Sequence, residues 1–143
     1  VYYAYKQMPR AIEAFEQVVN IRLLLYGTDQ HPLVQKAIAN LAEMYRQDEQ
    51  FQKAYDLNYR EKYEQWQQVE NREEHIEYAA FLNNYAGVCA GLHWYEQAEA
   101  HFLTSVSISK KILGEDHEHY RRRCRNLGRY YVSLGWYDKA LPW

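Results

Sequence analysis

The sequence repeats at intervals of about 43 residues, and this spacing constrains the fold more than any other feature. Four alanines open similar segments and lie 43, 44 and 42 residues apart: Ala11, Ala54, Ala98 and Ala140. An asparagine lies 14 residues before three of them, at Asn40, Asn84 and Asn126. A histidine recurs in the same register, at His31, His75 and His117. Markers that keep one register indicate a structural unit that is copied along the chain.

Each unit reads as a helix hairpin. Gly27 and Gly114 follow apolar helical runs, where a left-handed residue commonly ends a helix, and Asn71 also tolerates that conformation. Asp116 is the expected N-cap of a helix that begins near His117. Small residues recur where two antiparallel helices would approach closely, first at Ala42, Ala86 and Gly128, then at Ala54, Ala98 and Ala140.

These signals predict an all-α chain without strands. The expected helices are residues 1–6 and 9–26, 32–47 and 51–69, 72–90 and 95–113, and 117–134 with a partner from 137. The predicted organisation is one domain over 1–143, with a partial repeat at 1–30, repeats at 31–74 and 75–116, and a partial repeat at 117–143. A single hairpin cannot bury both of its faces, so neighbours are expected to stack into a solenoid. We expect the sequence to be a fragment of a longer chain.

Composition argues against several classes of function. The net charge is −2 and no apolar run reaches membrane-spanning length, which disfavours nucleic-acid binding and membrane insertion. Fifteen tyrosines and four tryptophans favour helix packing or an interface. Cys89 and Cys124 fall on apolar helical positions, which favours buried, reduced thiols in a cytoplasmic protein, with a disulfide as the alternative.

No pattern in the sequence supports catalysis or a cofactor. A nucleophile elbow, a phosphate loop, a zinc-protease motif and a carboxylate dyad are all missing. His117 and His119, with the neighbouring acidic residues, could suggest a metal site. They are two positions apart on a helix start, however, so they do not share a face. We therefore expect neither a catalytic residue, a metal ligand nor a small-molecule substrate.

Three segments together resemble a known family. They read Leu-Asn-Asn-Tyr-Ala at 82–86, Tyr-Glu-Gln-Ala at 95–98 and Ile-Leu-Gly-Glu-Asp-His at 112–117. This pattern is similar to the tetratricopeptide repeat, in the long form that kinesin light chains carry. That form has 42 residues, the length of 75–116 in this sequence. The departures are Cys89 in place of tyrosine, Glu49 and His93 in place of turn glycines, Glu118 in place of proline, and an atypical, long second helix holding Asn58, Tyr63 and Trp66.

The resemblance implies a right-handed superhelical α-solenoid of antiparallel helix hairpins that binds a partner protein or peptide without catalysis. The groove positions that it implies are Lys36, Ala39, Asn40 and Glu43, then Ala80, Asn83, Asn84 and Gly87, then Arg122, Arg125, Asn126 and Arg129. Asparagine can both donate to and accept from an extended peptide backbone. Alternatively, the repeating asparagine only bonds the backbone of the neighbouring repeat.

Arg122, Arg125 and Arg129 have helical one-face spacing, and with Arg121 and Arg123 they form the densest basic patch. Arginine binds carboxylates bidentately, so we expect an acidic peptide ligand, with an aromatic anchor as a further possibility. The alternatives are a solvated face or ion pairs with Glu73 or Glu77. The chaperone type of carboxylate clamp is not reproduced, because its positions hold Ala39 and Glu43.

Two other functions remain open at this point. The segment could be a structural scaffold within a large assembly, held by its tyrosine- and tryptophan-rich surfaces. It could also be a regulatory repeat domain attached to a catalytic domain outside this sequence.

Overall fold

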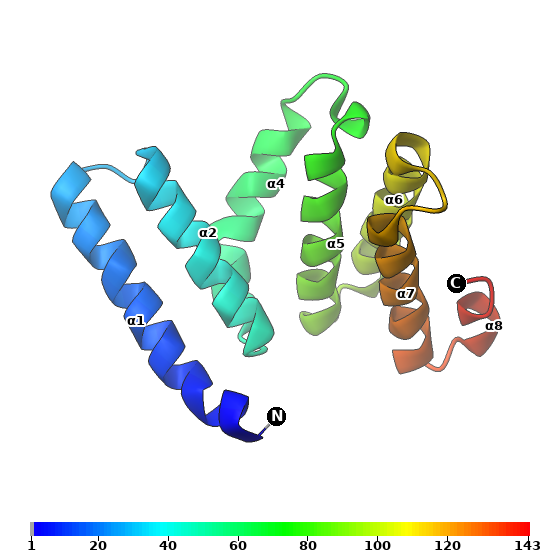
Figure 1. Ribbon diagram of the computed structural model, residues 1–143, viewed down its shortest axis with the longest axis horizontal. Coiled ribbons are helices and arrows are strands. Elements are labelled where there is room, and N and C mark those ends of the chain that lie inside the picture. The colour runs from blue at the N-terminus through cyan, green and yellow to red at the C-terminus, as the bar shows by residue number, and fades with distance from the viewer. Residues whose placement is uncertain (1) are drawn as a thin grey trace. The chain divides into compact units, whose positions relative to one another are not determined.

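The computed structural model describes the backbone of residues 2–143 and the side chains of residues 7–143. The chain divides into two compact units, Val1–Glu64 and Gln65–Trp143, which are described separately (Figure 1). Every regular element in the described residues is a helix, so the all-α prediction is confirmed. The elements in order are α1 Tyr2–Tyr26, α2 Pro32–Gln47, α3 Phe51–Ala54, η1 Tyr55–Tyr59, α4 Arg60–Gln67, η2 Arg72–Glu74, α5 Ile76–Gly91, α6 Tyr95–Leu113, α7 Glu118–Ser133 and α8 Tyr137–Ala140.

In the first unit α1 and α2 pack side by side as an antiparallel pair, and α2 packs in turn on α3 and η1 (Figure 1). The buried apolar residues recur at helical spacing, with Val34, Ala37 and Leu41 on α2 facing the other helices. The hydroxyl of Tyr45 donates to Glu16 Oε1 over 2.6 Å and links α2 to α1. These contacts build a small apolar core with polar links at its edge.

The first predicted hairpin is wrong, because the chain does not turn between residues 6 and 9. α1 is one helix from Tyr2 to Tyr26 and contains Pro9. Lys6, Gln7 and Met8 are good helix formers, and no glycine is present to end the helix. Proline removes one hydrogen bond in a helix interior but does not force the chain to reverse.

The second helix of the next hairpin contains a π-helical turn. We predicted one helix over 51–69, and the structure has α3, η1 and α4 in continuous succession, ending at Gln67. The backbone N–H of Arg60 bonds the carbonyl of Tyr55, five residues back, which is the π-helical pattern. A π turn accommodates one extra residue in a helix, which accounts for one of the two residues by which 31–74, with 44, exceeds 75–116, with 42.

In the second unit α5 packs on α6, α6 on α7 and α7 on α8. The core is built from Leu82, Val88, Phe102, Val106 and Leu127, all buried. Ring contacts continue it, since Phe102 and Tyr130 have centroids 5.2 Å apart. The hairpin of α5 and α6 is visible in Figure 1 as two helices joined by a short turn.

A chain of buried polar groups crosses this core. Ser105 Oγ donates to the carbonyl of Ala79 on α5 over 2.6 Å. Ser109 Oγ donates to the carbonyl of Ser105, also over 2.6 Å, and Arg123 Nη1 donates to Ser109 Oγ over 2.6 Å. Burial, reinforced by the nearby charge of Arg122, lowers the pKa of Arg123. The bonds satisfy polar groups that would otherwise destabilise the interior.

The recurring histidines directly precede three helices and cap two of them with their side chains. His31 and His117 are N-caps whose Nδ1 atoms accept hydrogen bonds from the backbone N–H groups of Leu33 and His119, over 3.2 and 3.1 Å. His75 holds the same position before α5 without a side-chain cap bond. The prediction that Asp116 is the N-cap is therefore wrong. His117, one residue later, holds that position, and its Nδ1 accepts a hydrogen bond from the backbone N–H of His119. The helix predicted from 72 starts only at Ile76, after the short 3-10 helix η2.

The turns adopt the backbone conformation that their residues favour. Gly27, Asn71 and Gly114 have φ of 69°, 55° and 84°. Gly27 and Gly114 directly follow α1 and α6 as predicted, but Gly114, with ψ of 164°, lies outside the left-handed helical region. Asn71 is left-handed but precedes η2, four residues after α4 ends. The hairpin turns use Glu49, His93 and Gly135, with φ of 60°, 65° and 74°. Glu49 and His93 adopt a conformation that is unfavourable for residues with a side chain, at a cost of about 1–2 kcal/mol each.

Both cysteines are buried and form no disulfide, and burial raises the pKa of Cys89 to about 11.

The small residues lie where the helices of each hairpin touch. Ala42, Ala54, Ala86 and Ala98 are fully buried. A Cβ atom at Gly128 would lie 3.3 Å from Cβ of Trp143. These positions fix how closely two helices approach, because a larger side chain would force them apart.

Replacing Ala98 with arginine tests this register. Ala98 is 0% exposed, so Ala98→Arg should lower the free energy of unfolding by at least about 3 kcal/mol, by burying an unpaired charge in a contact without space. Ala100→Arg places the same side chain on an exposed position of α6 and should change it by less than about 0.5 kcal/mol. Urea unfolding followed by circular dichroism measures both, and equal stabilities for the two variants would contradict the packing described.

A second prediction concerns alkaline pH. Burial and the hydrogen bond to Glu16 raise the pKa of Tyr45 to about 12, and burial and Glu99 raise those of Tyr130 and Tyr131 to about 12. The unfolded value is about 10, so the folded state binds these protons more tightly. Their contribution to stability is full below about pH 10 and is lost as the pH rises towards about 12.

Thermal unfolding monitored by circular dichroism, with tyrosinate absorbance read in parallel, checks this. We expect the melting temperature to fall steeply above about pH 10, and less steeply in Tyr131→Phe, which removes one of the raised groups. Ionisation of all the tyrosines near their ordinary pKa without unfolding would refute it.

Candidate functional site

α7 carries three exposed arginines along one side. Arg122, Arg125 and Arg129 are separated by three and four residues, so they share a face of the helix, and all three are exposed. Arg125 Nη2 lies 2.9 Å from Glu118 Oε1 on the same helix. The hydrogen bond from Arg125 lowers the pKa of Glu118. The pair is solvated, so it holds Arg125 only weakly against a competing carboxylate.

The other two arginines of the predicted basic patch differ from each other: Arg121 is exposed, four residues before Arg125 on α7, whereas Arg123 is buried. Arg123 is 4% exposed and donates to Ser109 inside the second unit, so its inclusion in the patch is wrong. Its position was open to prediction, since Leu127 and Tyr130 follow it at helical spacing on the buried face. Arg121 Nη2 lies 3.4 Å from Asp116 Oδ1. Among the described residues, the ion pairs that these arginines make are with Asp116 and Glu118 and not with Glu73 or Glu77.

Two predicted asparagines contact each other. Asn126 Nδ2 donates to Asn83 Oδ1 over 3.2 Å and joins α7 to α5. This bond joins two side chains. The alternative stated above for the repeating asparagine was a bond to the backbone of the neighbouring repeat, which is a different contact. One amide bond of this kind leaves further donors and acceptors on both residues. Asn83, Asn84 and Asn126 are all half-buried, so each is partly open to solvent.

A pocket of about 430 Å³ lies beside the arginines. Arg125 and Arg129 line it together with Gly128, Val132, Ser133, Ala140 and Trp143. Its surface is mainly apolar, with two cationic side chains at one side. Val132 follows Arg129 by three residues and could have been found from helical spacing. Trp143 reaches the pocket only because α8 folds back on α7, which no sequence spacing signals.

The predicted residues of the first unit lie on α2. Lys36 and Asn40 are exposed, whereas Glu43 is half-buried. The carboxylate of Glu43 accepts hydrogen bonds from Arg46 and from Tyr59, the latter over 3.3 Å. Burial, which would raise the pKa of Glu43, is outweighed by its hydrogen bonds, above all that from Arg46, and the pKa is lowered. Glu43 is therefore already engaged within its own unit.

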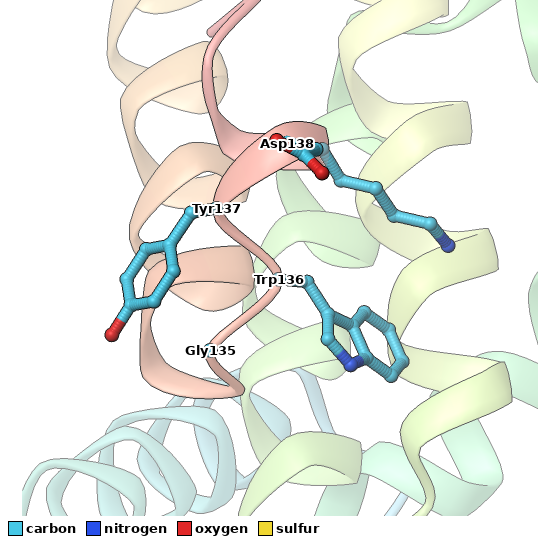
Figure 2. Close-up of a pocket in the computed structure, with 5 residues that line it drawn as sticks. Gly135, Trp136, Tyr137 and Asp138 are labelled. Carbon is cyan, nitrogen blue, oxygen red and sulfur yellow. The ribbon is translucent and has the colours of Figure 1, made fainter.

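A second pocket, of about 520 Å³, surrounds the turn before α8 and is lined by Gly135 to Lys139 (Figure 2). The rings of Trp136 and Tyr137 point to opposite sides of this segment (Figure 2). Lys139 Nζ lies 4.7 Å from the Trp136 ring centroid and 3.0 Å from Glu99 Oε1. The hydrogen bond from Lys139 lowers the pKa of Glu99. In this pocket Lys139 therefore already occupies the position beside the indole ring of Trp136.

The histidines near α7 are used in the fold. The rings of His117 and His119 have centroids 5.2 Å apart, but Nδ1 of His117 accepts the capping bond. Within residues 7–143 no three histidine, cysteine or acidic side chains are grouped so that they could hold a metal ion. The described helices also include none that is long and apolar enough to cross a membrane.

Comparison with known proteins places the chain among repeat proteins. The family model described as "Tetratricopeptide repeat" matches residues 77–143. The curated proteins contain no match. Solved structures match over 99% of this chain, among them BtubC (BKLC) from P. vanneervenii, at 22% identity with a TM-score of 0.69. A putative kinesin light chain of Podosopora anserina with nearly identical TPR-like repeats matches at 24% identity and 0.69, and its Q17M variant at 24% and 0.71.

The chain spans 55% of the length of BtubC and 65% of each of the two others. At these identities the likeness concerns the fold, an all-α solenoid of helix hairpins. Tetratricopeptide repeat domains are typically non-catalytic and bind protein partners. Residues 77–143 therefore match the tetratricopeptide repeat family, and the chain as a whole shares the fold of these repeat proteins.

Proposed function

We propose that this chain is a non-enzymatic interaction module that binds an acidic peptide segment of a partner protein at α7. The observation that carries the proposal is the apolar pocket of about 430 Å³ beside Arg125 and Arg129. A peptide carboxylate could bond a guanidinium bidentately while a neighbouring apolar or aromatic side chain enters the pocket. The module would act in the cytoplasm, with neither nucleic acid nor a small-molecule substrate as its ligand.

The electrostatics of α7 support an acidic ligand. Three exposed arginines lie on one face, in a chain whose net charge is −2. Glu118 is the one acidic side chain among the described residues that is paired with them, and it is fully solvated. A ligand with two or more carboxylates could displace this weak pair and gain several charge-assisted bonds.

The asparagines support a second part of the proposal. Asn83 and Asn126 hold each other through one hydrogen bond, which restrains both amides before a ligand arrives. Their remaining donors and acceptors suit the backbone of an extended peptide. Restrained side chains lose less conformational freedom on binding, which favours affinity. Asn84 stays in the proposal as a further contact on α5. Lys36, Asn40 and Glu43 stay predicted peptide contacts of the first unit by itself, although Glu43 would first have to leave Arg46.

A scaffold role is the second candidate, and exposed apolar residues favour it. Tyr137, Leu141 and Val132 are 65%, 83% and 51% exposed in the second unit. Side chains of this size often mark interfaces when they are grouped on a surface. In this role the chain would hold neighbours in a large assembly, or regulate an attached catalytic domain, without a dedicated peptide site.

Charge reversal on α7 tests the peptide proposal. The probe is a fluorescent peptide of alternating aspartate and glutamate residues around one tryptophan, and anisotropy measures its dissociation constant. The double variant Arg125→Glu, Arg129→Glu should weaken binding at least about tenfold, and binding to the wild type should weaken as salt rises.

The matched control carries the same change in net charge on α6. Lys110 and Lys111 are exposed and lie outside the pocket, so Lys110→Glu, Lys111→Glu should leave the dissociation constant within about twofold. If both double variants weaken binding equally, the peptide is held by net charge and the α7 site is refuted. If neither variant changes the binding of natural partners, the scaffold role is favoured.

A further inference from the structure

The first unit contains a cavity of about 610 Å³ that the peptide proposal does not use. Three elements line it: the end of α1 with the loop that follows, α2, and the helix that starts in η1 and continues in α4. All of its lining residues lie within Val1–Glu64, so the site belongs to one compact unit. Its volume is in the range of pockets that hold ligands in proteins.

The cavity combines an apolar wall with acidic groups. Leu23, Ile38 and Leu57 supply aliphatic side chains from the three elements. Asp29 and Glu61 are the charged residues among those that line it, and both are exposed, so their carboxylates meet solvent at the edge. The basic Arg22, beside Leu23, is not among the residues that line the cavity, and its Nη1 donates to the carbonyl of Leu33 over 2.8 Å.

The π-helical turn contributes to this wall. Leu57 and Asn58 belong to η1, where the helix has an i to i−5 hydrogen bond. A π turn changes the direction of side chains relative to a regular α-helix, and such turns are frequent at functional sites. Here it places an aliphatic and an amide side chain together in the lining.

This site is separate from the predicted peptide groove. Lys36, Asn40 and Glu43 share one side of α2, whereas Gln35 and Ile38, which line the cavity, project from another side of the same helix. One ligand segment therefore need not compete with the other. The two sites also differ in charge, since α7 presents arginines and the cavity presents carboxylates.

We propose that the cavity of the first unit binds a basic, apolar segment of a partner protein, with an aliphatic side chain against Leu23, Ile38 and Leu57 and a lysine or arginine at Asp29 and Glu61. Charge complementarity selects this occupant, because the residues that line the cavity include two acidic side chains and no basic one. A lysine or arginine of the ligand would replace the interaction that Glu61 already makes within the chain. The amide of Asn58 can bond the peptide backbone between the two side chains. The chain would thus join two partner segments of opposite charge.

The test uses the whole chain and a short fluorescent peptide in which leucine and arginine alternate. The variant Asp29→Lys, Glu61→Lys should weaken its binding at least about tenfold. The control Glu13→Lys, Glu64→Lys makes the same change in net charge on exposed residues of the same unit outside the cavity, and should weaken it by less than about threefold.

The apolar part has its own matched pair. Leu23 lines the cavity, whereas the adjacent Leu24 is 87% exposed and does not. Leu23→Ser should weaken binding of the peptide several-fold and Leu24→Ser should not, with circular dichroism confirming that both variants are folded. Equal effects of cavity and control variants, or no binding of this peptide to the wild type, would overturn the proposal.

The acidic peptide used for α7 separates this proposal from the first. Its binding should be unchanged in Asp29→Lys, Glu61→Lys, and the leucine–arginine peptide should bind Arg125→Glu, Arg129→Glu as it binds the wild type. Loss of both peptides in one variant would mean a single shared site, which overturns the separate cavity site and leaves the α7 site to its own charge-reversal test.

Discussion

The fold depends on the close approach of paired helices at positions where only small side chains fit. Ala86 on α5 and Ala98 on α6 are fully buried, and Ala42 and Ala54 repeat the arrangement in the first unit. At Gly128 even a Cβ atom would press on Trp143. Because the helices touch there, the larger residues around them interdigitate and the polar bonds between helices reach their normal lengths. The exposed faces that carry the candidate sites are positioned by these contacts.

Polar side chains then decide the details that packing leaves open. Tyr45 and Tyr131 each donate to a glutamate of a neighbouring helix, Glu16 and Glu99, over 2.6 and 2.9 Å. A lysine lies over each of these rings, Lys53 and Lys139, at 5.5 and 5.7 Å from the centroid. The position equivalent to these tyrosines holds Cys89 in the intervening repeat. The same arrangement is thus used twice, once in each unit, and gives two of the fifteen tyrosines a structural role.

The candidate sites follow from the same surface chemistry, with opposite signs. On α7 the arginines face solvent beside an apolar pocket, and in the first unit two carboxylates border an apolar cavity. In both proposals an apolar wall would supply affinity and a charge at its edge would supply selectivity, so each site would discriminate between partner segments. A module with two such sites would bring two segments of opposite charge together without any chemistry of its own.

The sequence by itself determined the helical class, the repeat period, the buried small residues and the glycines that end α1 and α6, because spacing and backbone preference are local properties. It also indicated the exposed arginines of α7. Only the tertiary structure decided that α1 continues through Pro9, that η1 is a π turn and that His117 is the cap in place of Asp116. The buried position of Arg123 could be read from helical spacing, but the tertiary structure decided that its partner is Ser109 and that Trp143 folds back onto Gly128. Each of these features depends on which neighbouring atoms are within hydrogen-bond or packing distance. Periodicity shows which residues share a face of a helix, but it does not give the distance from that face to atoms of the next helix.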